Sequence, residues 1–415
     1  MKHFFGSLIL PLTLTLMLYT PTLHAQTPRG NARDGSFFTS ETLPYSVLHM
    51  REFMPTTNVP RGNAVRPRAF RYNLDEEAID RLTFIPTGGS EPLTWRESLE
   101  LNYADGVVIL HRGKIVYERY FEDMHSCQPH ALMSVTKSFT GTLAATLVAE
   151  GRLDPDNRVD FYLPELAGSG FGDATVRQVM DMTTSIVYSE EYTDPNAEVW
   201  RFSAAGNAMV EHPEGTPQGY HDFLATIRKD NTHGTTFGYR TVNTDVLGWI
   251  VERVGEAPLA EQLRKRVWRR MGMEQDAYYQ VDATGTAFAG GGLNATVRDL
   301  ARFGEMMRRG GRWHGEQIIP EEVIDDIRFG SDPEPFEASD YGKKLPGWSY
   351  RNMWWVSNNE DGAYMARGVH GQAIYIDPAA EMVIVRVAHN PQASNTLNDH
   401  ISLPAYQAIA DYLKR

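Results

Sequence analysis

Two segments near opposite ends of the chain have the pattern of β-hairpins, and they constrain the fold more than any other feature of the sequence. Each consists of two largely apolar, β-branched runs on either side of a turn. The paired runs are Val107–Leu110 with Lys114–Phe121, and Ala373–Ile376 with Met382–Ala388. Between the hairpins, helical patterns dominate from about residue 155 to 285. This arrangement predicts one antiparallel sheet, assembled from both ends of the chain, with a helical insertion.

A long helical pattern covers residues 135–150, where apolar residues recur at helical spacing and Gly151 provides a C-terminal stop. We expect residues 46–160 and 286–415 to form a sheet-containing domain, and residues 161–285 to form the helical insertion. Further helices are predicted at Val176–Met182, Val246–Val254, Val297–Arg308 and about 404–413.

The first 25 residues have the pattern of a secretory signal peptide. Lys2 supplies the positive charge, Leu8–Tyr19 forms a short apolar run, and Ala25 ends a candidate cleavage site. The apolar run is shorter than a typical membrane span, and an uncleaved N-terminal anchor is the alternative. We therefore expect an exported, periplasmic protein with no stable membrane span once residues 1–25 are removed. Residues 26–45, rich in Gly, Ser, Thr and Pro, are expected to form a flexible arm.

The composition excludes several classes of protein. With 53 acidic and 40 basic residues the net charge is −13, which argues against a nucleic-acid binder, because such proteins contact phosphates with Lys and Arg. A single cysteine, Cys127, excludes a disulfide scaffold and is either incidental or a nucleophile paired with a histidine. The sequence also contains no G-x-S-x-G, H-E-x-x-H, P-loop or G-x-G-x-x-G motif.

Ser134-Val135-Thr136-Lys137 forms an S-x-x-K motif at the start of the first long helical pattern. Residues three apart share a helix face, so the Lys137 amine is expected beside the Ser134 hydroxyl. There it could polarise the hydroxyl or, with a lowered pKa, accept its proton. The N–H groups of a helix N-terminus would also stabilise an oxyanion. The alternative is structural, with Ser134 capping the helix and Lys137 exposed to solvent.

Further motifs lie in a fixed order on both sides of the S-x-x-K motif. They are Met50-Arg51-Glu52 with Pro55-Thr56, Tyr239 with Asn243–Gly248, Gly291–Leu293 with Arg298–Leu300, and Gly368–Gln372. With these motifs the chain resembles the serine β-lactamase-like hydrolases over most of its length and, among them, the 6-aminohexanoate-dimer (nylon-oligomer) hydrolases and their esterase relatives. The resemblance implies an α+β, β-lactamase/transpeptidase-like fold, in which helices flank an antiparallel sheet and a helical region is inserted.

The resemblance implies that Ser134, Lys137 and Tyr239 are the catalytic residues, since a tyrosine from the helical region acts as acid or base in such enzymes. A phenol needs cationic neighbours to become a phenolate, and Lys137 would be one. Many relatives carry Asn two residues after this tyrosine, whereas this chain has Thr241, which argues against strong β-lactam hydrolysis. The alternative for Tyr239 is an aromatic core residue.

The strand that carries Lys/His-Thr-Gly in β-lactamases has Arg367-Gly368-Val369 in this chain. The resemblance implies that the N–H groups of Val369 and Ser134 form the oxyanion hole, and that Gly368 lets the strand approach the substrate closely. An alternative register places His370 and the following glycine there. Arg367 is expected either to bind a substrate carboxylate or to lie on the surface.

Two aromatic features complete the candidate site. Tyr192 lies where nylon-oligomer hydrolases carry a tyrosine that contacts the substrate amide, and its alternative role is that of a packed loop aromatic. Trp354 and Trp355 shortly precede the strand with Gly368. Because adjacent residues of a strand face opposite sides, at most one of the two tryptophans can face the site.

These features predict a serine hydrolase that cleaves small linear amides or carboxylic esters through an acyl-enzyme on Ser134, without a metal or cofactor. Two other functions stay open. A penicillin-recognising β-lactamase or D-Ala-D-Ala peptidase is disfavoured by the missing Lys-Thr-Gly strand. A non-catalytic ligand-binding protein with the same fold is disfavoured by the complete Ser-Lys-Tyr set. The sequence leaves the physiological substrate and the oligomeric state open.

Overall fold

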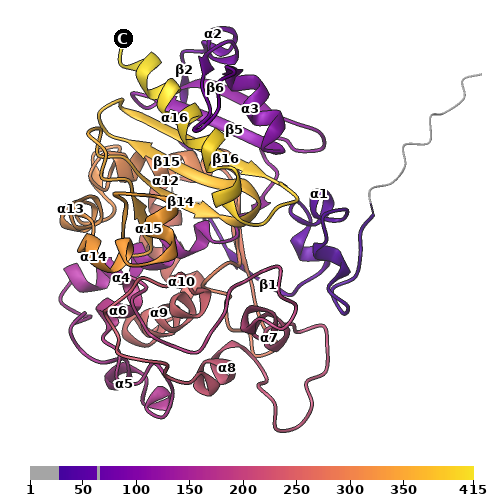
Figure 1. Cartoon of the computed structure of the whole chain (residues 1–415), viewed down its shortest axis with the longest axis vertical. Helices are drawn as coiled ribbons and strands as arrows, with labels where there is room; N and C mark the ends of the chain where they lie inside the picture. Colours follow the sequence, from indigo (N-terminus) through magenta and orange to yellow (C-terminus); the bar gives the residue numbers. More distant parts are fainter. Residues whose placement is uncertain (1–27, 63–65) are drawn as a thin grey trace, which may run out of the picture.

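A computed structural model describes residues 28–62 and 66–415, and its largest element is an eight-stranded sheet (Figure 1). The signal peptide predicted for residues 1–25 lies outside the described residues. In spatial order the strands of the sheet are β12 (Ser349–Arg351), β13 (Trp354–Val356), β14 (Tyr364–Gly368), β15 (Gln372–Asp377), β16 (Met382–Ala388), β5 (Ala104–His111), β6 (Lys114–Tyr120) and β2 (Arg71–Tyr72).

The two ends of the chain meet in this sheet, as the two hairpins predict. Strand β16 of the C-terminal hairpin pairs antiparallel with β5 of the N-terminal hairpin, and Ile384 lies opposite Ile109. Both strands are buried along nearly their whole length, which explains why their sequences are continuous apolar runs without polar alternation. The sheet is antiparallel except at its edge, where β2 pairs parallel to β6.

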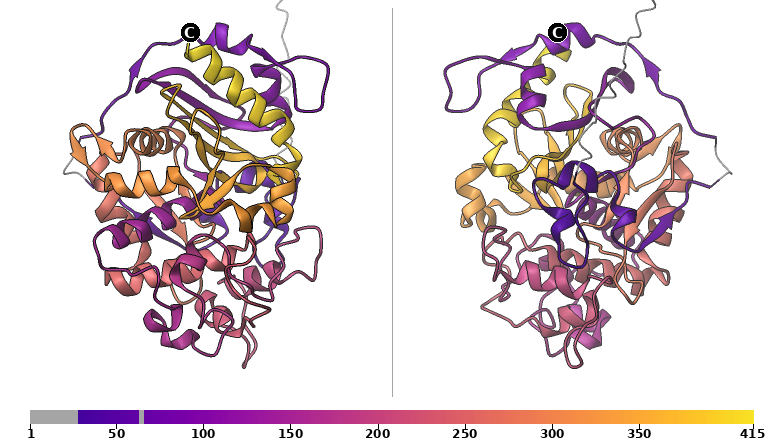
Figure 2. Two further views of the ribbon diagram at one scale, coloured as in Figure 1. Left: turned by 60° about the vertical axis from the view of Figure 1, so that its left-hand side comes forward. Right: turned by 90° about the vertical axis from the view of Figure 1, so that its right-hand side faces the viewer.

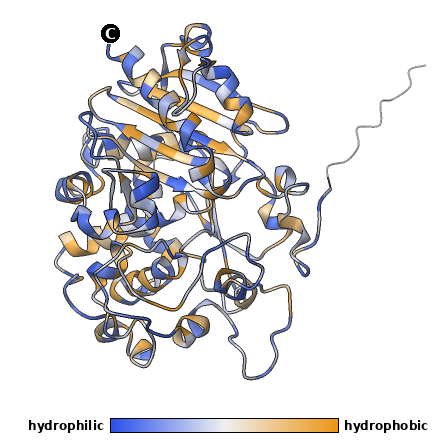
Figure 3. Cartoon of the chain, viewed as in Figure 1, coloured by the Kyte–Doolittle hydropathy of each residue, from blue (hydrophilic) through white to orange (hydrophobic). Residues whose placement is uncertain are grey.

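Helices cover both faces of the sheet, as Figures 1 and 2 show. Helix α12 (Val297–Arg308) packs on β16, β15 and β5, and α4 (Val135–Ala149) packs on β14 on the same side. The opposite face carries α3 (Trp95–Leu101) and the C-terminal α16 (Asp399–Leu413). Apolar residues are concentrated along the strands between these layers (Figure 3). Helix α16 begins earlier than the predicted 404–413 and contains Pro404.

A second, four-stranded sheet leads the chain into α4. Its strands, in spatial order, are β1 (Thr56–Val59), β8 (Ala277–Gln280), β9 (Leu293–Ala295) and β7 (His130–Ala131). Strand β7 ends three residues before Ser134, and its neighbour β9 follows the Gly290–Gly292 segment. This small sheet, which the sequence did not predict, therefore brings the start of α4 beside the glycine segment.

The middle of the chain forms the helical region below the main sheet in Figure 1. Its central helix, α9 (Thr241–Gly255), packs against α4 and begins five residues before the predicted start at Val246. The other helices here are α5 (Val159–Tyr162), α6 (Val176–Met180), α7 (Glu198–Ala205), α8 (Tyr220–Thr226), α10 (Leu259–Leu263) and α11 (Arg269–Met271). Strand β8 also falls within residues 161–285, and the proposed division into a domain and an insertion stays a prediction.

Smaller elements complete the described fold. Two short hairpins pair β3 (Thr83–Phe84) with β4 (Leu93–Thr94), and β10 (Arg312–Trp313) with β11 (Glu316–Gln317). Further α-helices are α2 (Glu76–Asp80), α13 (Glu321–Phe329), α14 (Pro333–Glu337) and α15 (Asp340–Lys344). Within residues 28–62 and 66–415, no helix combines the length and the apolar character needed to cross a bilayer.

Over its described part, the arm expected at residues 26–45 combines mostly exposed residues with a few that pack on the domain. It contains a short helix, α1 (Leu43–Ser46), and the side chains of Ala32 and Leu43 are buried in the core. Phe37 also stacks on Phe53 at 5.1 Å between ring centroids. The polar composition of the segment concealed the few apolar residues that attach it to the domain.

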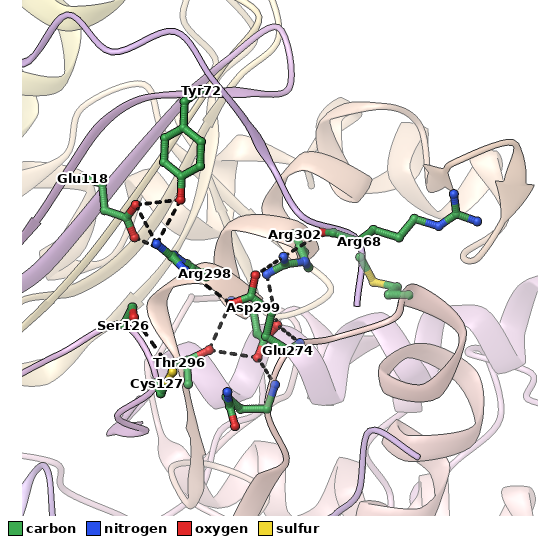
Figure 4. Close-up of polar contacts among 12 residues, drawn as sticks. Arg68, Tyr72, Glu118, Ser126, Cys127, Glu274, Thr296, Arg298, Asp299 and Arg302 are labelled. Carbon is green, nitrogen blue, oxygen red and sulfur yellow. Dashed lines mark hydrogen bonds and ion pairs between the residues drawn. The ribbon is translucent and has the colours of Figure 1, made fainter. Parts of the chain in front are cut away.

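A buried ionic cluster fixes the start of α12 (Figure 4). The Asp299 carboxylate accepts hydrogen bonds from the backbone N–H groups of Glu274 and Gln275, at 2.7 and 3.0 Å, and from the Thr296 hydroxyl at 2.9 Å. The Arg302 guanidinium lies 3.3 Å from Asp299, and neither side chain is exposed. These contacts tie α12 to the segment before β8.

Replacing Asp299 by alanine is therefore expected to lower the free energy of unfolding by about 2–4 kcal/mol, because it leaves two backbone N–H groups without their acceptor and removes one of the two carboxylates that pair with the buried Arg302 guanidinium, the other being Glu274. Urea denaturation measures this loss. The matched control is Glu100→Ala, which breaks an exposed ion pair with Arg96 and should cost no more than about 1 kcal/mol. Equal effects of the two substitutions would contradict a stabilising role for the cluster.

Candidate active site

Ser134 lies at the turn between β7 and α4, where it is the N-cap residue of the helix. Its side chain makes no capping hydrogen bond, so the structural alternative for this serine is wrong. The preceding residue, Met133, has a φ of 48°, an uncommon left-handed conformation for a non-glycine residue. Ser134 is only 7% exposed.

The Lys137 amine contacts the Ser134 hydroxyl directly. Its Nζ lies 2.8 Å from Ser134 Oγ and 2.6 Å from the carbonyl oxygen of Gly290. The side chain is buried, so the alternative of a solvated first-turn lysine is also wrong. Burial lowers the pKa of Lys137, and the negative charges of Glu190 and Asp245 act against this shift. A buried amine with a lowered pKa beside a hydroxyl is suited to accept its proton.

Asp245 of α9 binds the glycine that contacts Lys137. One of its carboxylate oxygens accepts the backbone N–H of Gly290 at 3.2 Å, while the other is buried without a hydrogen-bond partner among the described residues. Burial raises the pKa of Asp245, and the nearby Lys137 charge acts to lower it. The carboxyl group thus holds the glycine whose carbonyl in turn accepts from Lys137.

Tyr239 lies immediately before α9 and faces the same serine. Its ring centroid is 5.3 Å from Lys137 Nζ, and a hydrogen bond with Ser134 acts to lower its pKa. Burial and the negative charge of Glu190 outweigh this contact and raise the pKa of Tyr239 well above its ordinary value. These influences favour the neutral phenol, which is suited to donate a proton, and the expected effect of Lys137 on this phenol stays a prediction.

An aromatic cluster forms one wall of the site around Tyr239. Trp355 lies 5.2 Å from the Tyr239 ring, and Tyr341 and Tyr350 lie 6.1 and 6.2 Å from it. Trp354, on the opposite side of β13, packs on Phe303 and donates its indole N–H to a threonine of α4. Only Trp355 therefore contacts the site, as the alternation of strand side chains requires.

The end of β14 passes very close to the turn that carries Ser134. A Cβ atom on Gly368 would lie 2.6 Å from the backbone oxygen of Leu132, so only glycine fits at this approach. The backbone N–H groups of His370 and Gly371 donate to Ala393 and Asn395, at 3.0 and 3.2 Å. Since these two donors are already used, the geometry favours the oxyanion register that places Val369 beside Ser134.

Replacing Gly368 by alanine is expected to lower kcat by about 10- to 100-fold, because the added methyl group displaces β14 from the Ser134 turn by a fraction of an ångström to an ångström. Steady-state hydrolysis of a chromogenic ester measures the effect. Gly89→Ala is the matched control, since its Cβ would meet only Pro86, no closer than 3.3 Å, in a surface turn. Unchanged kcat in Gly368→Ala would contradict a role for this close approach.

The two remaining candidate residues, Arg367 and His370, lie in different surroundings. Arg367 is not a surface residue: it is buried, paired with Asp399 at 2.5 Å, and its guanidinium lies 5.1 Å from the centre of the Trp355 ring. His370 donates through Nδ1 to the backbone oxygen of Asn390 and packs against the N-terminal segment, which is a structural arrangement. Among the described residues His370 makes no hydrogen bond with Ser134 or Lys137, and its substrate-binding role stays a prediction.

Sequence reasoning did not identify three groups of this site. Asp245 belongs to the matched Asn243–Gly248 motif and Gly290 directly precedes the matched Gly291–Leu293 motif, but nothing in their spacing indicated that Gly290 contacts both Lys137 and Asp245. Glu190 was missed altogether, although it lies two residues before Tyr192 and accepts a hydrogen bond from its phenol at 2.6 Å. The contacts of Lys137 with Gly290 and of Glu190 with Thr241 join elements that lie far apart in the chain, and they become visible only in the folded structure.

The comparison with protein families identifies the class. The family model described as Beta-lactamase matches residues 103–403. The chain therefore belongs to the β-lactamase family, and its relatives are hydrolases, so the chain is a serine hydrolase.

Individual proteins and solved structures are similar to this chain over most of its length. The chain is 34% identical over 347 residues to the 6-aminohexanoate-dimer hydrolase of Paenarthrobacter ureafaciens, covering 84% of this chain and 85% of that protein. A solved structure from Bacillus anthracis, described as a candidate 6-aminohexanoate-dimer hydrolase, superimposes with a TM-score of 0.83 at 32% identity, covering 93% and 97% of the two chains. EstCE1, a hydrolase with promiscuous acyltransferase activity, shares the fold, with a TM-score of 0.61 at 17% identity over 76% of this chain and 96% of its own.

Proposed function

We propose that this protein is an exported serine hydrolase that cleaves small linear amides or carboxylic esters through an acyl-enzyme on Ser134. The observation that carries the proposal is the buried contact between Lys137 Nζ and Ser134 Oγ at 2.8 Å. Export is supported by the N-terminal sequence of residues 1–25. A linear amide substrate is supported by the similarity to the 6-aminohexanoate-dimer hydrolase.

Acylation begins with transfer of the Ser134 proton to the neutral amine of Lys137, which keeps its other contact to the Gly290 carbonyl. Ser134 Oγ bonds to the substrate carbonyl carbon, and the backbone N–H groups of Ser134 and Val369 stabilise the oxyanion. Breakage of the bond to the leaving nitrogen or oxygen is assisted by a proton from the Tyr239 phenol. Lys137 then returns a proton to Tyr239.

Deacylation reverses these roles with water as the nucleophile. The neutral Lys137 accepts a proton from the water, whose oxygen bonds to the acyl carbon, and the same proton is returned to Ser134 Oγ as the ester bond breaks. Tyr192, which is attached to the site through Glu190, and Trp355 provide the surface against which the substrate chain lies.

A substrate panel combined with active-site labelling tests this function. The purified protein is assayed with a short-chain p-nitrophenyl ester, a linear 6-aminohexanoate dimer and a chromogenic cephalosporin. It is then treated with a serine-reactive phosphonate and analysed by peptide mass spectrometry. We expect ester or amide hydrolysis and a phosphonate adduct on Ser134.

Other outcomes of this panel would select a different function. Faster turnover of the cephalosporin than of the esters and amides would assign a β-lactamase. Absence of both hydrolysis and adduct, together with a ligand-induced increase in melting temperature, would assign a binding protein.

A further inference from the structure

Glu190 lies between three parts of the candidate site. One carboxylate oxygen accepts hydrogen bonds from the Tyr192 phenol at 2.6 Å and from the Thr241 hydroxyl at 2.5 Å. The other oxygen accepts the backbone N–H of Thr241 at 2.5 Å. Thr241 is the first residue of α9, two residues after Tyr239, so a single half-buried carboxylate joins the Tyr192 loop to the helix start beside the catalytic phenol.

Thr241 makes two of the hydrogen bonds that hold Glu190. Its hydroxyl and its backbone N–H both donate to the Glu190 carboxylate. The N-cap residue of α9, Arg240, makes no side-chain capping bond, so the Glu190 carboxylate satisfies an otherwise orphaned N–H and lies at the positive end of the helix. Threonine at this position therefore serves as the support of a carboxylate.

The negative charge of Glu190 raises the pKa of both groups that transfer protons in the proposed reaction, Lys137 and Tyr239. Glu190 and Asp245 are the two carboxylates that raise the pKa of Lys137 against the effect of burial. Glu190 also raises the pKa of the Tyr239 phenol, whereas the Arg367 guanidinium on β14 lowers it. Other ionisable groups that feel the charge of Glu190 are the Asp245 carboxyl, the Arg240 guanidinium and four phenols, those of Tyr188, Tyr192, Tyr341 and Tyr350.

We propose that Glu190, supported by Thr241, is a positioning residue that holds Tyr192 at the site and supplies the negative charge facing Lys137 and Tyr239. This inference rests on the proposed hydrolase function and adds a residue to its machinery. The carboxylate keeps the phenol of Tyr239 protonated for donation to the leaving group. It also opposes loss of the proton that Lys137 gains from Ser134, so it stabilises the ammonium that forms during acylation.

The test compares pH profiles of kcat/KM for Glu190→Gln and Glu191→Gln. Glutamine keeps the length of the side chain but removes its charge, so the pKa of Lys137 falls further below its ordinary value. Because kcat/KM rises with pH as Lys137 loses its proton, the rising limb should move to lower pH by about half a unit or more. The maximal kcat should fall by about tenfold, since the glutamine amide cannot accept hydrogen bonds from every donor that the Glu190 carboxylate serves.

Glu191→Gln is a matched control, because Glu191 is exposed and the hydrogen bonds that its carboxylate makes among the described residues go to Thr193 in its own loop. Its pH profile should coincide with that of the wild type. An active Glu190→Gln enzyme whose profile also coincides with the wild type would overturn the role of Glu190. A wild type with no hydrolysis that depends on Ser134 would instead overturn the proposed function, so the two failures are distinguishable.

A second variant decides the question if Glu190→Gln does not fold. Thr241→Val removes the hydroxyl that supports Glu190 but keeps the shape of the side chain and the backbone N–H. With the carboxylate less firmly held, we expect a lower kcat and a shift of the pH limb in the same direction. A Thr241→Val enzyme with wild-type kcat and wild-type pH dependence would overturn the inference.

Discussion

Replacement of Ser134 by alanine is expected to lower kcat/KM for ester hydrolysis by about 10⁴-fold or more, the largest effect of any single substitution in this protein. The substitution removes the only atom that becomes acylated, while the Lys137 amine and the Tyr239 phenol remain. Ser134 Oγ accepts from Lys137 Nζ at 2.8 Å, and the side chain makes no capping bond, so α4 loses no support. The melting temperature should change by no more than a few degrees.

Steady-state kinetics and phosphonate labelling measure this effect together. Ser126→Ala is the matched control, because its hydroxyl contacts only the thiol of the adjacent Cys127, which is exposed. The control should keep wild-type activity and the phosphonate adduct, whereas Ser134→Ala should lose both. Residual activity within tenfold of the wild type would show that another residue is the nucleophile.

Replacement of Lys137 by methionine is expected to lower kcat/KM by about 10³-fold, since it removes the proton acceptor while filling nearly the same volume. A general base at this position contributes roughly 10²–10⁴-fold, and the oxyanion donors would remain. Unlike Ser134→Ala, this variant should still form the phosphonate adduct, although slowly. The rate of adduct formation therefore separates the role of Lys137 from that of Ser134.

The same variant is expected to change how stability depends on pH. Without the Lys137 charge, the pKa of Asp245, which burial already raises, should increase further. A carboxyl group with a raised pKa in the folded state favours folding at low pH, and this contribution is lost as pH rises through that pKa. Lys137→Met should thus lose more melting temperature relative to the wild type at neutral pH than in acid. Lys114→Met, an exposed control on β6, should show no such dependence.

Much of the fold follows from local sequence patterns. The four strand runs of the two hairpins and the helices over 135–150 and 297–308 coincide with observed elements to within a few residues. They are long or strongly apolar, and local periodicity suffices to define them. The short strands β7, β8 and β9 were not predicted, because segments of two to four residues carry too little pattern and depend on pairing partners far away in the chain.

The early start of α9 has a similar cause. Residues Thr241–Asp245 are polar except for Val242, yet all of them are buried. Their helical conformation is stabilised by contacts of the Glu190 and Asp245 carboxylates with distant backbone groups. Apolar periodicity begins only at Val246, which is where the sequence pattern placed the helix. Hydrophobic spacing alone therefore does not predict helical residues that are polar and buried at a functional site.

The sequence by itself determined the pair at the centre of the proposed chemistry. Ser134 and Lys137 are three residues apart at a helix start, and helix geometry alone places such residues side by side. The burial that lowers the pKa of Lys137, the approach of Gly368 to the Ser134 turn, and the positions of Tyr239, Asp245 and Glu190 were decided by the tertiary structure. These features depend on how α4, α9 and β14 pack together, and residues that lie more than a hundred positions apart have no local spacing from which such a contact can be inferred.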